Sequence, residues 1–164
     1  MMIDNLFQSA QAIKKILPQD NRITLVSGCF DLIHVGHIHL LEYASSLEDL
    51  LVVAVLSDEY ARRYKDVQRP IIPQLQRAGM VASLRCVDFV YVSNISPNSS
   101  ETLQLLEPDS IVFGEDLINP EKMEQRIKNV SSVLSDITIR FLPRYTEEEV
   151  STNLIIDKIR GVRT

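Results

Sequence analysis

The chain has 164 residues but no tryptophan, and it contains only two cysteines, Cys29 and Cys86. These cysteines are far apart and form no CxxC pair, so neither a disulfide scaffold nor a cysteine-rich zinc site is expected. No apolar run approaches the roughly 18 residues needed to cross a bilayer. The first residues, Met1 to Asn5, lack the basic and apolar regions of a signal peptide. We therefore expect a cytoplasmic protein with reduced thiols that does not act at a membrane.

A surplus of basic residues is also missing. The formal net charge is −5 at pH 7, whereas a general nucleic-acid surface needs a basic face. Nucleic acid is therefore not an expected partner, but a small phosphorylated ligand is not excluded, because such an attraction is local. The apolar fraction of 45% is ordinary for a globular protein. The length suits a single domain over residues 1–164, with an N-terminal helix within 1–20 and a catalytic core over 22–160.

What the sequence does have is an alternation of strand and helix patterns. Apolar or β-branched runs predict five strands, at residues 23–26, 50–56, 88–92, 110–113 and 137–142. Apolar residues at helical spacing predict helices at residues 5–17, about 40–47, 73–84, 99–106, 120–130 and 150–159. Such alternation is typical of βαβ units. The predicted fold is therefore α/β, a Rossmann-like doubly wound five-stranded parallel sheet with helices on both faces.

Polar segments follow four of the predicted strands. They are residues 28–37, Ser57-Asp58, residues 114–116 and Arg144. In open parallel sheets, ligands bind beyond the carboxyl ends of the strands. Because those ends meet at one edge of the sheet, we expect the four segments to converge there and form the functional site.

All three histidines lie between positions 34 and 39, inside the first of these segments. A strand that ends at glycine and restarts as a helix directs N–H groups outward, and with the helix dipole these groups form an anion site. The imidazoles of His34 and His37 add donors near physiological pH. Gly28 and Gly36 are expected to let the backbone approach a phosphate closely. The segment is therefore suited to hold a phosphate and to do chemistry on one.

The string from Gly28 to His37, Gly-Cys-Phe-Asp-x-x-His-x-Gly-His, resembles the signature of the HxGH nucleotidyltransferase superfamily. Within it, the chain is similar to the cytidylyltransferase-like family. That family includes glycerol-3-phosphate and ethanolamine-phosphate cytidylyltransferases and the heptose 1-phosphate adenylyltransferase domain. Residues 57–77 and 142–153 extend the resemblance, which covers about residues 22 to 160.

The resemblance implies an enzyme that transfers an NMP group from CTP or ATP to a phosphorylated sugar, polyol or alcohol and releases pyrophosphate. Mg²⁺ is the expected cofactor, as a hard cation that neutralises the triphosphate. No metal site made by the protein is expected, because no cysteine or carboxylate stands at zinc-ligand spacing from the histidines. The expected partners are the NTP and the phosphorylated acceptor. Relatives are often dimers, so a homodimer stays open.

The resemblance also implies roles for individual residues. His34, His37 and Lys65 are expected to be catalytic. Nucleotide-binding roles are expected for Gly28, Cys29, Phe30, Gly36, Gly114, Asp116, Arg144, Ser151 and Thr152. Substrate-binding roles are expected for Asp31, Asp58 and Arg77.

Simpler interpretations exist for these residues. A histidine near a helix start is often a cap or a packing residue, although two in an HxGH string make that explanation much weaker. Asp31 could stabilise an Asx turn, line the acceptor pocket or orient a histidine. Residues 114–116 could equally be a turn or a contact to the ribose or base. Ser151 and Thr152 could cap the last helix as well as offer donors to phosphates.

One segment departs from the family pattern. The compact Arg-Thr-Glu-Gly-x-Ser-Thr motif becomes residues 144–152 here, which are longer, lack the glycine and include Glu147 to Glu149. The NTP and the acceptor are therefore undecided. A catalytically silent nucleotide-binding module on the same fold is the main alternative function. A metal-dependent hydrolase is a weaker one, because the ligand spacing is missing.

Overall fold

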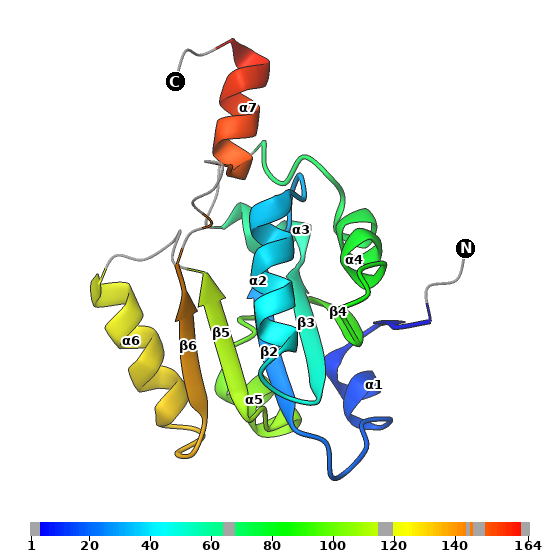
Figure 1. Cartoon of the computed structure of the whole chain (residues 1–164), viewed down its shortest axis with the longest axis vertical. Coiled ribbons are helices and arrows are strands. Elements are labelled where there is room, and N and C mark those ends of the chain that lie inside the picture. The colour runs from blue at the N-terminus through cyan, green and yellow to red at the C-terminus, as the bar shows by residue number, and fades with distance from the viewer. Residues whose placement is uncertain (1–3, 64–67, 115–119, 144, 146–149, 162–164) are drawn as a thin grey trace.

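The computed structural model describes residues 4–63, 68–114, 120–143, 145 and 150–161. Across these residues, six parallel strands form one sheet in the order β1-β4-β3-β2-β5-β6 (Figure 1). The strands are β1 (Leu6–Phe7), β2 (Ile23–Gly28), β3 (Leu50–Leu56), β4 (Phe89–Ser93), β5 (Ser110–Gly114) and β6 (Thr138–Leu142). The chain runs from β2 outward to β4 and then returns to the other side of β2. The strand order therefore reverses between β2 and β5, the kind of position where such sheets bind ligands.

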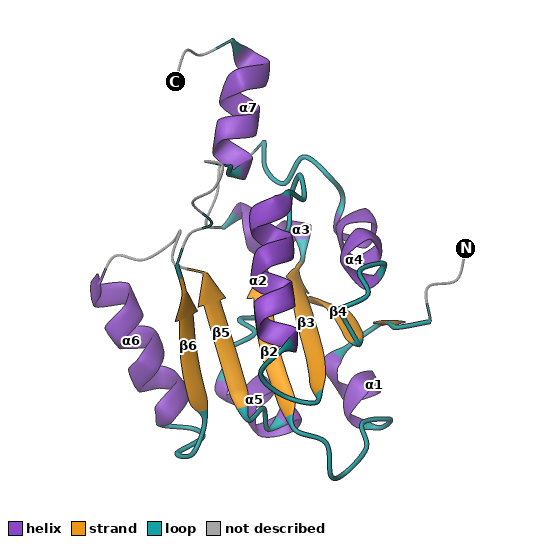
Figure 2. Cartoon of the chain, in the orientation of Figure 1, coloured by secondary structure: helices purple, strands orange, loops and turns teal. Residues whose placement is uncertain are grey.

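Helices cover both faces of this sheet (Figure 2). On one face lie α2 (Val35–Ser45) and α4 (Gln74–Ala82), and on the other lie α1 (Ala10–Lys14), α5 (Ser100–Leu106) and α6 (Pro120–Ser131). The short α3 (Asp58–Arg62) directly follows β3. The last helix, α7 (Thr152–Arg160), extends beyond the carboxyl ends of the strands (Figure 1). It therefore stands at the edge where the site is expected.

The central strand β3 shows why the sheet has two covered faces. Leu51, Val53 and Val55 belong to the core beneath α2 and α4, whereas Val52 and Ala54 belong to the core beneath α1 and α5. Successive side chains of a strand point to opposite faces. A strand in which both sets are fully buried must therefore be apolar throughout, as the run over residues 50–56 predicted.

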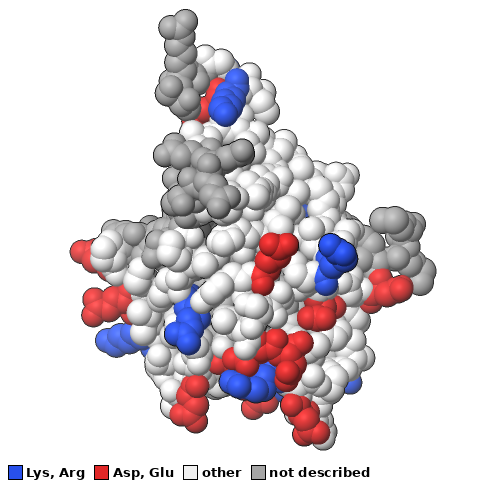
Figure 3. Space-filling model, viewed as in Figure 1, with Lys and Arg blue, Asp and Glu red and all other residues white. Residues whose placement is uncertain are grey.

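Carboxylates bind the chain at the amino ends of the strands. The backbone N–H groups of Ile23 and Leu51 donate to Asp109 and Asp88, each at 2.8 Å. Charged side chains of both signs also gather toward this end on the face shown in Figure 3. Part of the acidic surplus thus supports the edge of the sheet opposite the predicted site.

The structure confirms the predicted Rossmann-like α/β sheet and all five predicted strands, and it corrects the N-terminal segment. Residues 5–17 were expected to form one helix, but Leu6 and Phe7 form β1, which pairs with β4. The helix is limited to α1, where the Ser9 side chain caps it by accepting a hydrogen bond from Ala12 N at 3.2 Å. Phe7 packs on Phe89, with ring centroids 5.8 Å apart. The apolar spacing therefore reflected a strand contact as well as a helix face.

Among the described residues, no helix is both long enough and apolar enough to span a bilayer.

Candidate active site

The histidine segment connects β2 to α2 at the reversal of strand order. His34 is the N-cap of α2, and its backbone N–H donates to Nδ1 of His37 at 3.4 Å. The two imidazole rings are stacked, with centroids 3.9 Å apart and an angle of 26° between their planes. The ring of Phe30 packs beside this pair, with its centroid 5.3 Å from that of His37. The first turn of the helix thus holds both rings as one unit.

The two glycines of the motif make room for these rings. A Cβ atom on Gly36 would lie 3.1 Å from the His34 ring, and one on Gly28 would lie 2.9 Å from the Phe30 ring. The sequence predicted that both glycines admit a phosphate. The missing side chains give space to aromatic rings of the segment itself, and the close approach of a phosphate stays a prediction.

The turn between β2 and His34 has an unusual backbone. Phe30 and Leu32 have φ values of 52° and 48°, in the left-handed region that non-glycine residues rarely adopt. Each such residue costs roughly 1–3 kcal/mol unless its surroundings hold it. Strain of this kind is commonly found where a segment is shaped for function. Asp31, which lies between the two, provides the contacts that hold the turn.

A small cavity opens beside the histidine rings. As bounded by the described residues it measures about 60 Å³, well below the several hundred Å³ of pockets that enclose a drug-sized ligand. The cavity brings together the start of α2, the end of β5, the end of β6 with the segment after it, and Val150, which precedes the N-cap of α7. It is lined by His34, Gly36, His37, His39, Leu40, Gly114, Leu142, Pro143, Tyr145 and Val150.

His39 stands outside the motif, and the sequence leaves it as a surface residue or one that lines the substrate pocket. In the structure it lines the cavity, and its ring packs on Tyr145 at 5.1 Å between centroids. Other lining residues were not predicted from the sequence. Tyr145 follows the arginine that the motif singled out, but an aromatic residue carries no signal of its own in that pattern. Leu40 and Val150 supply an apolar wall, which the helix periodicity of Leu40 assigned to the core alone.

Asp31 is buried, with 1% of its surface exposed. One carboxylate oxygen accepts hydrogen bonds from Arg69 Nε and Ile71 N, and the other accepts one from Ile72 N, all at 3.0 Å. Burial alone would raise the pKa of Asp31, but the two backbone N–H groups and the Arg69 charge hold it below its usual value. Both oxygens are thus occupied by the protein, and the predicted substrate contact of Asp31 remains a prediction.

Arg77 has the same internal character. It is fully buried, and its Nε and Nη1 donate to the carbonyl oxygens of Ile72, at 2.8 Å, and of Cys29. Its Nη2 donates to the carbonyl of Leu56 at 2.9 Å and to Asp58 at 2.7 Å. Arg77 therefore ties the ends of β2 and β3 together. Binding of substrate by Arg77 and Asp58 stays a prediction, and the contacts described here are structural.

The start of α7 reaches the same turn. Ser151 caps the helix by accepting a hydrogen bond from Leu154 N at 3.2 Å, as its position in the sequence predicted. The hydroxyl of Thr152 donates to the carbonyl oxygen of Asp31 at 2.9 Å. The two hydroxyl residues predicted to contact phosphates thus stand beside the histidine segment, with their oxygens already engaged in protein contacts.

Three predicted site residues, Lys65, Asp116 and Arg144, lie outside the described residues, as do Glu147 to Glu149. Gly114 is described and lines the cavity, with Leu40 beside it. Across the described ranges, no group of three or more His, Cys, Asp or Glu side chains is arranged to hold a metal ion. Two predicted catalytic residues, His34 and His37, are therefore brought together, and the third stays a prediction.

Comparison with known proteins identifies the family of this chain. The family described as "Cytidylyltransferase-like" matches residues 25–158. The chain belongs to this family. The family match confirms the resemblance drawn from the histidine motif, and with it the nucleotidyltransferase class. The match also spans every residue that lines the cavity, from His34 to Val150.

Individual relatives of this cytidylyltransferase-like chain are bacterial. "Bifunctional protein HldE" of Helicobacter pylori (strain P12) is 34% identical over 158 residues, which cover 92% of this chain. The protein of the same name from Geotalea uraniireducens (strain Rf4) is 34% identical over 160 residues, or 96% of this chain. The matches cover 32% and 31% of these relatives, so the chain corresponds to about a third of their length.

Solved structures show the same architecture. A "lipopolysaccharide core biosynthesis protein" from Thermoplasma volcanium GSS1 has a TM-score of 0.65 and 27% identity, covering 77% of this chain and 99% of that one. A pantoate-beta-alanine ligase from Francisella tularensis has a TM-score of 0.54 and 14% identity, covering 95% of this chain and 77% of that one. The second likeness concerns the fold alone.

Proposed function

We propose that this cytidylyltransferase-like chain transfers the NMP group of CTP or ATP to the phosphate of a small phosphorylated acceptor. The observation that carries the proposal is the stacked pair of His34 and His37, which lines a small cavity at the reversal of strand order. The strand-turn-helix geometry supports the same conclusion, because the first turn of α2 presents N–H groups and a positive dipole end to an anion.

In the proposed reaction, an oxygen of the acceptor phosphate attacks the α-phosphorus of the NTP in line with the leaving group. A new P–O bond forms, the bond to the bridging oxygen of the β-phosphate breaks, and pyrophosphate leaves with the electron pair. The α-phosphate oxygens gain negative charge in the five-coordinate transition state. Donors from His34 and His37 stabilise that charge, each contributing about 3–4 kcal/mol by analogy with oxyanion-hole deletions.

The remaining predicted contacts are part of this proposal. Lys65 bridges to the transferred phosphate, Arg144 binds terminal phosphate oxygens, and Asp116 accepts hydrogen bonds from the ribose or base. The hydroxyls of Ser151 and Thr152 stand at the start of α7, where a helix N-terminus favours phosphate. All five residues belong to segments that follow the carboxyl ends of strands in the sequence.

The described residues bear on how a divalent cation would be held. The described residues offer no cluster that could hold a metal ion, so we propose that Mg²⁺ is bound mainly by the triphosphate oxygens of the NTP. When bound, Mg²⁺ neutralises charge on the phosphates and on the leaving pyrophosphate. The protein groups at the cavity are neutral or cationic donors, which complement a triphosphate that carries its own cation.

We further propose a sugar phosphate as the acceptor. The support comes from the likeness to the lipopolysaccharide core biosynthesis protein and from the sequence resemblance to the heptose adenylyltransferase domain. The acceptor phosphate must reach the α-phosphorus beside the histidines. The sugar is then expected to lie outside the 60 Å³ cavity.

A pyrophosphate-release assay tests the function. Folded protein, verified by circular dichroism, is incubated with Mg²⁺ and each combination of CTP or ATP with sugar 1-phosphates, glycerol 3-phosphate or phosphoethanolamine. We expect release with one NTP and a sugar phosphate, and no release when the acceptor is left out. Release with an alcohol phosphate alone would contradict the sugar acceptor. Binding of NTP by calorimetry without release for any acceptor would instead establish the silent nucleotide-binding module.

A further inference from the structure

The last helix, α7, has few apolar contacts to keep it in place. Ile156 is the one buried residue of this helix, whereas Ile159 is 76% exposed. Figure 1 shows α7 outside the two helical layers, beyond the carboxyl ends of the strands. Its first turn is also held by polar contacts. Those contacts lead to a single residue of the histidine segment, Asp31.

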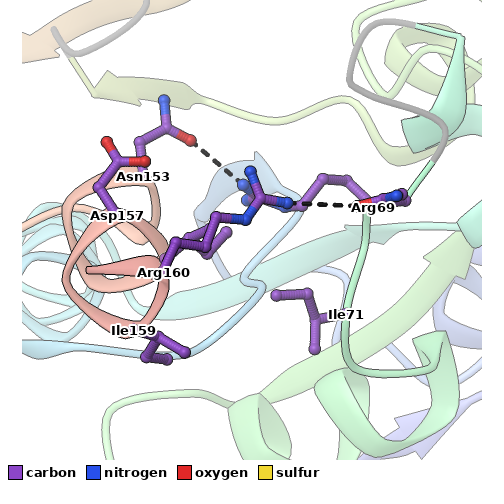
Figure 4. A pocket seen from close by; sticks show the side chains of 8 residues that line it. Arg69, Ile71, Asn153, Asp157, Ile159 and Arg160 are labelled. Atoms are coloured by element: carbon purple, nitrogen blue, oxygen red, sulfur yellow. Dashed lines mark hydrogen bonds between the residues drawn. The ribbon is translucent and has the colours of Figure 1, made fainter. Parts of the chain in front are cut away.

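Two chains of hydrogen bonds join α7 to Asp31. The direct one runs from the Thr152 hydroxyl to the Asp31 carbonyl oxygen at 2.9 Å. The second passes through Arg69, whose Nε donates to the Asp31 carboxylate at 3.0 Å and whose Nη1 donates to Oδ1 of Asn153 at 3.1 Å. Figure 4 shows the Arg69–Asn153 bond at the groove between the loop of residues 68–71 and α7.

The hydrogen bonds of Arg69 are not those expected of a residue that serves stability alone. Its side chain is 10% exposed, and its buried Nη2 has no hydrogen-bond partner among the described residues. A buried guanidinium with an unsatisfied nitrogen bears a desolvation penalty that a purely stabilising contact would avoid. The two bonds that it does make join segments that are 38 and 84 positions away in the sequence. The arrangement fits a residue that fixes geometry between distant segments.

We propose that Arg69 is a positioning residue that holds the first turn of α7 against the histidine segment through Asp31 and Asn153. This inference rests on the proposed function, in which the start of α7 contacts the phosphates of the NTP. The strained turn at Phe30 and Leu32 and the start of α7 share Asp31 as their support. Loosening the Arg69–Asn153 bond therefore weakens the binding of the NTP more than the binding of the acceptor.

The Asn153→Ala variant removes the Arg69 partner without touching Asp31. The Asn153 side chain is exposed at the surface of α7, so the variant is expected to fold. We expect the KM for the NTP to rise about fivefold or more, with the KM for the acceptor changed less than twofold. Asn153→Asp keeps an oxygen acceptor for Arg69 and is expected to restore most of the loss. A matched control is Arg160→Ala, in the same groove, because the hydrogen bond of Arg160 goes to Gln68 and not to Asp31 or Asn153.

Hydrogen exchange in the absence of nucleotide tests, independently of catalysis, whether the Arg69–Asn153 bond holds the first turn of α7. In Asn153→Ala, amides of the first turn of α7 are expected to exchange at least about fivefold faster than in the wild type, while those of α6 keep their rates. Equal exchange in α7 and equal KM for the NTP would overturn the proposal. So would the same changes in Arg160→Ala. If α7 exchanges faster as expected but the wild type turns over no NTP, the positioning role of Arg69 is supported and the proposed function is wrong.

Discussion

At the scale of single residues, the histidine pair combines two roles that usually belong to different side chains. His34 caps α2 and stacks on His37, so part of the environment of each ring is the other ring. Both rings also line the cavity. A packing role and a catalytic role therefore make different predictions for the same substitution, because only one of them affects turnover in a folded protein.

His37→Ala is expected to lower kcat at least about a hundredfold, because a donor to the transition-state charge is lost. The thermal midpoint is expected to stay near that of the wild type, since the ring is only partly buried. Pyrophosphate release and a melting curve on the same preparation provide the check. A variant whose lost activity merely follows its lost folded fraction would support the packing role.

Asp31 predicts a pH dependence of stability. Its pKa in the folded protein is held below the ordinary value of 3.8, so the folded state favours the ionised form. The stabilisation is therefore present above the unfolded pKa and is lost as the pH falls through the folded pKa. Asp31→Asn should be less stable than the wild type at pH 7, with a difference that shrinks as the pH falls below about 3.8 in urea unfolding. A difference that does not depend on pH would show that shape, and not charge, holds the turn.

Tyr91 is a buried residue whose polar group is expected to lower stability. Burial raises the pKa of its hydroxyl, and that oxygen has no hydrogen-bond partner among the described residues. An unpaired buried hydroxyl costs roughly 1–3 kcal/mol. Tyr91→Phe is therefore expected to leave the free energy of unfolding unchanged or to raise it by up to about 1 kcal/mol. A clear loss in chemical denaturation would reveal a partner for the hydroxyl.

At the scale of elements, patterns within one segment were readable from the sequence. The strand over residues 50–56 is apolar because both of its faces are covered, and Ser151 caps α7, which is one of the two roles that its position offered. Contacts between segments were not readable. The two-residue strand β1 depends on pairing with β4, and no pattern in residues 5–17 separates that strand from the start of a helix.

In the candidate site too, features within one segment could be predicted from the sequence, and contacts between segments could not. The HxGH string identified His34 and His37, because its spacing is local. The Asp31–Arg69 bond joins residues 38 positions apart, and the spacing of charges in the sequence does not indicate it. For the same reason the protein contacts of Asp31 and Arg77 could not be read from the sequence, and the binding of substrate by these residues stays a prediction. Local motifs can be recognised in a sequence, but residues that become partners only in the fold cannot.

Gly36→Ala separates the stability of α2 from its function. Alanine favours a helix over glycine by up to about 1 kcal/mol, so the thermal midpoint should stay or rise. The added Cβ would lie 3.1 Å from the His34 ring, and the ring must shift by a few tenths of an ångström. We expect kcat to fall about tenfold or more, measured by pyrophosphate release. Unchanged kcat in a stable variant would mean that the position of His34 is not critical.

At the scale of the whole molecule, the strand order decides where a ligand can bind. The carboxyl ends of β2 and β5 flank the reversal, and the histidine segment and Gly114 follow these two strands. At the opposite edge, the backbone N–H groups of Ile23 and Leu51 donate hydrogen bonds to Asp109 and Asp88. A nucleotide should therefore change the dynamics of one edge of the sheet and leave the other unchanged.

Hydrogen exchange with and without the Mg²⁺ complex of the NTP that supports turnover is expected to show this asymmetry. Amides of residues 28–37 and 151–154 should exchange more slowly, whereas the amides of Ile23 and Leu51, at the amino ends, should keep their rates. At a concentration a hundred times Kd, the free energy of unfolding should rise by about 2.7 kcal/mol. Chelation of the cation with EDTA should remove most of both effects, because the described residues supply no metal cluster to keep it. Protection that is uniform over the sheet, or stronger at its amino ends, would contradict a nucleotide site at the reversal of strand order.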